Sequence, residues 1–127
     1  MMIDDRLPED FIGPLTVRQA HRRAMDLAMD GMLAKDFHGD IERHKQQHIL
    51  ALPWELYAAR MIDKVIEAEP TRCSLYRSAA WIAYHSGDIW LAQQLAAEGL
   101  SGWPPPREAY CLREVLEQVW KDWDEQP

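Results

Sequence analysis

The sequence predicts an all-α fold of antiparallel helical hairpins in a single domain, with five to six helices. Its 127 residues are the length of one domain. Apolar residues recur at three- and four-residue spacing along most of the chain, and no segment alternates polar and apolar residues as a strand does. Glycines, prolines and capping residues separate these helical stretches. We expect an N-terminal arm over residues 1–15 and the helical domain over residues 16–127.

The first helices are expected to form a hairpin that turns at Gly39. Thr16, with a glutamine three residues later, has the pattern of a capping box that starts a helix. Gly39 suits the turn because a helix commonly ends at a residue with positive φ. Pro53 then either kinks the second helix or divides it, since proline removes a helical hydrogen bond. We expect division into helices over residues 41–51 and 54–69, because proline also suits the first turn of a new helix.

Three further signals divide the second half of the chain. Thr71 is expected to cap a helix that runs to Ser86. The triplet Gly-Asp-Ile at residues 87–89 repeats the triplet at residues 39–41 and predicts the next turn. The proline run at residues 104–106 ends one helix and begins another, which would cover the end of the helical stack. The apolar residues at helical spacing along this last helix are Ala109, Leu112, Leu116, Val119 and Trp123.

Composition and charge disfavour several classes of protein. The net charge of −7 opposes nucleic-acid binding, which relies on a basic surface. No stretch approaches the roughly 18 uncharged apolar residues of a membrane span. Cys73 and Cys111 have neither the number nor the spacing of a disulfide framework, and the first residues lack the pattern of a secretory signal. We therefore expect a cytoplasmic protein without nucleic-acid or membrane partners.

One residue pattern suggests a metal site. Asp40, His44 and His48 lie four residues apart on a predicted helix, so their side chains share one face. Two histidines and a carboxylate suit zinc or ferrous iron, but the zincin signature needs a glutamate where this chain has Lys45. The sequence carries no nucleophile-elbow motif and no glycine-rich phosphate loop. We expect no enzyme, no cofactor and no metal, with metal binding by Asp40, His44 and His48 as the alternative.

A repeat of 34 residues indicates a family of helical scaffolds. This interval separates Ala58 from Ala92 and Pro70 from Pro104, and it is the period of the tetratricopeptide repeat. The C-terminal two thirds of the chain resembles small bacterial tetratricopeptide-like proteins of uncharacterised role. The residues that carry the resemblance are Glu69-Pro70-Thr71-Arg72, Leu75-Tyr76-Arg77-Ser78-Ala79-Ala80, Gly87-Asp88 and Gly99-Leu100. The resemblance implies a short right-handed superhelix that binds another protein or peptide.

The resemblance also implies where the partner binds. The first helix of such a hairpin lines a concave surface, which here would include Arg77, Trp81 and Tyr84. Arg77 could bind a carboxylate through two hydrogen bonds, above an apolar floor of Trp81 and Tyr84; Trp81 suits the core equally well. The implied partner-binding residues are Ser74, Arg77, Ser78, Trp81, Tyr84 and His85. They lie opposite the implied packing residues, which are Tyr76, Ala79, Ala80 and Ala83. We expect a non-enzymatic adaptor.

Six tryptophans support a third hypothesis, because tryptophan is enriched at interaction hot spots. Trp90 directly follows the second Gly-Asp-Ile triplet, at a position that normally points outward. Trp120 and Trp123 lie three residues apart near the C-terminus, where a terminal helix cannot easily bury both. These three residues could seal a homodimer or a complex with an antitoxin-like partner.

Overall fold

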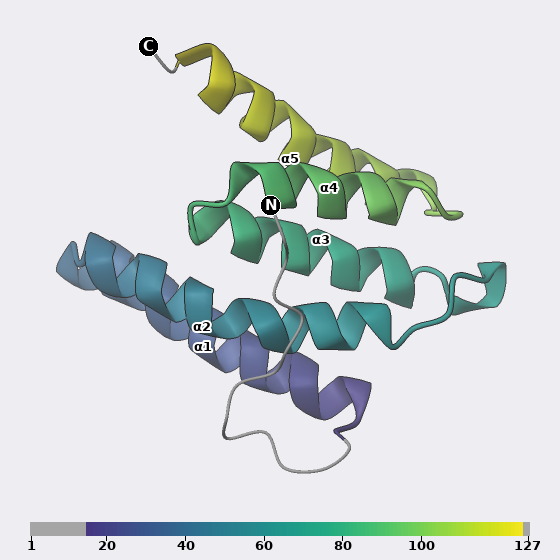
Figure 1. Cartoon of the computed structure of the whole chain (residues 1–127), viewed down its shortest axis with the longest axis horizontal. Coiled ribbons are helices and arrows are strands. Elements are labelled where there is room, and N and C mark those ends of the chain that lie inside the picture. The colour runs from purple at the N-terminus through teal and green to yellow at the C-terminus, as the bar shows by residue number, and fades with distance from the viewer. Residues whose placement is uncertain (1–14, 126–127) are drawn as a thin grey trace.

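The computed structural model describes residues 15–125, and within them the all-α prediction is confirmed. Five α-helices and one short 3-10 helix follow one another without a strand in this part of the chain (Figure 1). Apart from residue 15, the expected N-terminal arm lies outside the described residues. No helix among the described residues is long and apolar enough to cross a membrane. The elements are α1 (Val17–His38), α2 (Ile41–Arg60), η1 (Ile66–Ala68), α3 (Thr71–His85), α4 (Ile89–Leu100) and α5 (Pro106–Glu125).

Each α-helix packs against the next one in the chain. α1 and α2 form the first hairpin and α3 and α4 the second, joined by the packing of α3 on α2 (Figure 1). α5 packs on both α3 and α4, whereas α1 has almost no contact with α3. Helices are therefore stacked as hairpins, as expected, and the handedness of their superhelix stays a prediction.

The two Gly-Asp-Ile triplets form the same turn, as the sequence predicts. Gly39 and Gly87 have φ values of 63° and 96°, which only glycine adopts without strain. Asp40 then caps α2 by accepting a hydrogen bond from the backbone N–H of Arg43, and Asp88 caps α4 in the same way. The capping box at Thr16 is also present. These local signals set where α1, α2 and α4 begin and where α1 and α3 end.

The prediction that Pro53 divides the second helix is wrong. α2 is one helix from Ile41 to Arg60 with Pro53 inside it. An internal proline leaves the carbonyl of Ile49 without its helical donor, at a local cost of about 3 kcal/mol. Residues on both sides of Pro53 pack between α1 and α3, and Ala51 and Trp54 are both buried. This packing on two neighbouring helices outweighs the local cost and holds the helix together.

The start of α3 also differs from expectation. Thr71 is the first helical residue rather than the cap, and α2 ends at Arg60 instead of continuing to residue 69. The N-cap residue is Pro70, and the first turn is satisfied by Glu69 before it, whose Oε1 accepts a hydrogen bond from the Cys73 backbone N–H at 3.0 Å. Its Oε2 accepts a second one from the backbone N–H of Trp103, in the connection between α4 and α5. One buried carboxylate therefore joins two distant segments.

The core is built mainly from alanines, which allow the helices to approach closely. Leu112, Val115 and Val119 of α5 close one end of the core and are fully buried. The buried alanines on α1 to α4 are Ala20, Ala24, Ala34, Ala51, Ala58, Ala59, Ala79, Ala80, Ala83, Ala92 and Ala96.

Candidate functional site

α3 has a packing face and an open face, as the resemblance implies. The residues expected to pack, Tyr76, Ala79, Ala80 and Ala83, are all buried. All six residues expected to bind a partner are only partly buried. This separation of faces is confirmed, whereas partner binding by the open face stays a prediction.

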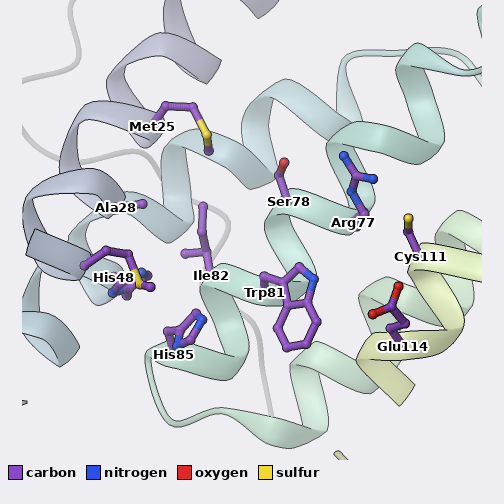
Figure 2. A pocket seen from close by; sticks show the side chains of 11 residues that line it. Met25, Ala28, His48, Arg77, Ser78, Trp81, Ile82, His85, Cys111 and Glu114 are labelled. Carbon is purple, nitrogen blue, oxygen red and sulfur yellow. The ribbon is translucent and has the colours of Figure 1, made fainter. Parts of the chain in front are cut away.

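One pocket lies on the C-terminal half of the open face, between α1 and α5. It has a volume of about 460 Å³, and we call it the aromatic pocket. Figure 2 shows Trp81 and His85 of α3 at its centre, with Met25 on α1 to one side and Glu114 on α5 to the other. Its lining residues are Met25, Ala28, Met32, His48, Arg77, Ser78, Trp81, Ile82, His85, Cys111 and Glu114.

A second pocket lies on the N-terminal half of the same face, between the first turns of α1 and α3. It has a volume of about 630 Å³, and we call it the basic pocket. Arg77 and Ser78 line both pockets, so the two adjoin along α3. Together they form a groove, here termed the α3 groove. The residues that line the basic pocket are Val17, Arg18, His21, Ile62, Pro70, Thr71, Ser74, Leu75, Arg77 and Ser78.

Five of the six predicted partner-binding residues line this groove, and Tyr84 lines neither pocket. Tyr84 interacts with α5, where burial and a hydrogen bond to Asp122 raise the pKa of its hydroxyl to about 12. Its ring still meets that of Trp81 edge to face at a centroid distance of 5.6 Å. Tyr84 therefore supports Trp81 from the side.

His85 belongs to a cluster of three histidines rather than standing alone. Its ring centroid lies 5.0 Å from that of His44 and 4.9 Å from that of His48. The carbonyl of Gly31 accepts a hydrogen bond from Nδ1 of His44, which leaves Nε2 of neutral His44 to accept from Nδ1 of His85 at 3.2 Å. Burial, followed by the neighbouring His48 and His44, lowers the pKa of His85 to about 4. Burial also lowers the pKa of His48.

The residues proposed as metal ligands do not converge as a set of three. His44 and His48 are buried and in contact, but Asp40 lies on the surface, where its carboxylate caps α2. Nδ1 of His44 and Nδ1 of His48 are both occupied by backbone carbonyls. Within residues 15–125, no group of three His, Cys, Asp or Glu side chains is arranged to hold a metal ion. The structure brings His44 and His48 together with His85 instead of Asp40.

Sequence reasoning missed a buried acid beneath the basic pocket. Glu55 of α2 is fully buried, and both of its carboxylate oxygens lie 2.9 Å from Nδ1 of His21. Burial raises the pKa of Glu55 to about 7, against the opposing effect of hydrogen bonds from His21 and Ser78. In a serine–histidine–acid relay the serine hydroxyl bonds to the histidine, which in turn bonds to the acid. Here Ser78 bonds directly to the carboxylate of Glu55, so the three residues do not form such a relay. The sequence did contain a signal for this burial, because Glu55 lies four residues after Ala51 and four before Ala59, on the apolar stripe of its helix.

The tryptophans of the third hypothesis form a partly exposed group on α4 and α5. Trp90 is 60% exposed, and its ring lies 4.5 Å from that of Trp123. Trp120 is 46% exposed and donates a hydrogen bond to Gln93. The expectation that the last helix cannot bury all its tryptophans is confirmed.

Comparisons with protein-family models, with curated proteins and with solved structures found no match to this chain. A function for this chain is therefore proposed from the geometry of the α3 groove.

Proposed function

We propose that this chain is a non-enzymatic, tetratricopeptide-like adaptor that binds a peptide or helix of a partner protein in the α3 groove. The observation that carries the proposal is that the two pockets adjoin along α3, where Arg77 and Ser78 line both. α3 has 15 residues and is therefore about 22 Å long at 1.5 Å per residue. This length accommodates about six residues of an extended peptide or about four turns of a helix.

The chemistry of the groove suits a peptide ligand. Trp81 offers an apolar aromatic surface that is only partly covered, which is typical of the anchors that dominate protein interfaces. Arg77 is half-buried, yet it makes no hydrogen bond or ion pair with any residue between 15 and 125. A partner that supplies an acceptor would satisfy a guanidinium that the fold leaves available.

Two further observations favour a tetratricopeptide-like scaffold and a cytoplasmic location. The helices α1, α3 and α5 supply most of the residues that line the groove, whereas α2 supplies only His48 and α4 none, which is the layout the tetratricopeptide resemblance implies. Both cysteines are free, in keeping with a reducing cytoplasm.

Affinity capture from native lysate, followed by binding measurements on peptides of the captured protein, tests this proposal. Trp81→Ala and Arg77→Glu should each weaken peptide binding by about tenfold or more, as expected for loss of an interface anchor. Trp90→Ala is the matched control, because Trp90 is exposed but lines neither pocket. Equal binding by Trp81→Ala and Trp90→Ala, with helicity retained in both, would refute the groove as the binding site.

A second candidate function is a homodimer, or a complex with an antitoxin-like partner, sealed by the tryptophans of α4 and α5. The exposure of Trp90 and Trp120 favours it, because exposed aromatic groups are typical of interfaces. Sedimentation equilibrium over a wide concentration range tests the dimer. A dimer that dissociates in Trp90→Ala or Trp120→Ala but not in Trp81→Ala would support this candidate, and a monomer at all concentrations would exclude the homodimer.

A further inference from the structure

We infer that the basic pocket binds the phosphate group of a phosphate monoester. The inference goes beyond the proposed function, since the ester can belong to a small molecule or to a phosphorylated side chain of the partner. It rests on the cations, hydrogen-bond donors and walls of this pocket.

Two arginines from different helices converge on the pocket without a counter-ion. Arg18 on α1 and Arg77 on α3 both line it, and neither has an ion pair or hydrogen bond within the described residues. Two other arginines of this acidic chain are paired, Arg43 with Asp30 and Arg72 with Glu98. No aspartate or glutamate is among the lining residues. The pocket therefore concentrates positive charge that an anion would neutralise.

The remaining polar groups of the pocket are donors or can serve as donors. Thr71 and Ser74 contribute hydroxyls from the first turn of α3, and Ser78, whose hydroxyl donates to Glu55, lines the pocket beside them. His21 lines the pocket while its Nδ1 is held by the buried carboxylate of Glu55. This contact holds the imidazole in place and leaves Nε2 without a partner among the described residues, so Nε2 can donate to a ligand in the forms of the ring that carry a hydrogen there.

Charge and donor number favour phosphate over carboxylate. A phosphate monoester carries close to two negative charges at pH 7 and three terminal oxygens, each of which accepts more than one hydrogen bond. A carboxylate brings one charge and two oxygens, so it would leave one of the two guanidiniums uncompensated. Val17, Ile62 and Leu75 supply apolar walls for the carbon skeleton of the ester.

Titration of the isotope-labelled full chain, followed by nuclear magnetic resonance, tests the inference with defined probes. The probes are N-acetyl-phosphoserine amide, glycerol 3-phosphate and inorganic phosphate, with N-acetyl-serine amide and N-acetyl-aspartate α-amide as neutral and carboxylate counterparts. The phosphate probes should give saturable shifts in the first turns of α1 and α3, with affinity at least about tenfold above that of the carboxylate. Tighter binding of phosphoserine amide than of glycerol 3-phosphate would assign the ester to a protein partner, and the reverse order to a small molecule.

Matched variants separate a built site from general attraction to positive charge. Arg18→Gln and Arg77→Gln should each weaken phosphate binding by about tenfold. Arg22→Gln is the control, because Arg22 lies one turn after Arg18 and is exposed like it, but lines neither pocket. Equal losses in all three variants, or equal affinity for phosphate and carboxylate probes, would overturn the inference.

The two proposals fail separately in these experiments. Trp81 lines only the aromatic pocket, so Trp81→Ala should leave phosphate affinity unchanged while weakening a partner peptide. Saturable phosphate binding without any groove-dependent peptide binding would support the phosphate site and refute the adaptor. Peptide binding without phosphate binding would do the opposite.

Discussion

Glu55 and His85 are expected to give the stability of this protein two opposing dependences on pH. Burial raises the pKa of Glu55 from 4.5 to about 7, and lowers that of His85 from 6.5 to about 4. Between pH 4.5 and 6.5 the folded chain holds a proton on Glu55 that the unfolded chain releases. Over the same range it lacks a proton on His85 that the unfolded chain binds. Rising pH therefore favours unfolding through Glu55 and folding through His85.

The expected magnitudes follow from one proton of difference at each site. Such a difference changes the free energy of unfolding by about 1.4 kcal/mol per pH unit. Glu55 is 0% exposed, so wild type should lose about this much stability per pH unit relative to Glu55→Gln as pH rises from 4.5 to 6.5. The slope for His85 has the opposite sign and the same size of about 1.4 kcal/mol per pH unit, because it is also set by one proton of difference. Relative to His85→Gln, wild type should gain that amount as pH rises.

Urea unfolding followed by far-ultraviolet circular dichroism, at several pH values between 4.5 and 6.5, measures both slopes. Glu55→Gln also changes a hydrogen bond with His21, and His85→Gln one with His44. Each of these losses changes the free energy of unfolding by the same amount at every pH, so it does not alter the slope. His38→Gln serves as the control, because His38 is an exposed histidine at the end of α1. Differences from wild type that do not vary with pH, or that have the same sign for both variants, would refute the reasoning.

Substitutions at two further positions, Gly102 and Gly39, test the turns. Gly102→Ala should destabilise the fold by about 1–3 kcal/mol, because the added Cβ would lie 2.6 Å from Arg72 Nη1 and Glu69 Oε2, both on buried side chains; an unchanged urea midpoint would contradict this. Gly39→Ala should cost about 1 kcal/mol through its positive φ alone, since nothing lies within 4 Å of the added Cβ. Gly39→Asn should recover part of that loss in calorimetric melting, because asparagine tolerates this conformation, and equal melting temperatures for the two variants would argue against backbone strain.

Local features of the fold could be predicted from residues near one another in the sequence. The capping box at Thr16 depends on a side chain three residues away. The turns at Gly39 and Gly87 depend on a glycine and the aspartate that follows it. The tetratricopeptide resemblance implied which residues of α3 are buried and which are open, and those residues recur at helical spacing. Each of these signals acts within about one helical turn, so the sequence alone determines them.

Predictions failed where a local preference competed with packing against distant segments. Pro53 favours a helix start, but the burial of α2 between α1 and α3 keeps the helix whole. Thr71 suits a cap, yet the N-cap position is Pro70, and the Glu69 side chain accepts from the first turn while also binding the Trp103 backbone 34 residues away. In both cases the tertiary contacts contribute more than the local preference.

By itself, the sequence determined that this protein is all-α, where most of its turns lie and which face of α3 is open. Only the tertiary structure decided what that face contains. His21 meets Glu55 across 34 residues, and His44 meets His85 across 41. Arg18 and Arg77 face one pocket because α1 and α3 both pack on α2 while hardly touching each other. Contacts of this kind depend on how helices stack, which is determined by the summed packing of many side chains and not by any short motif.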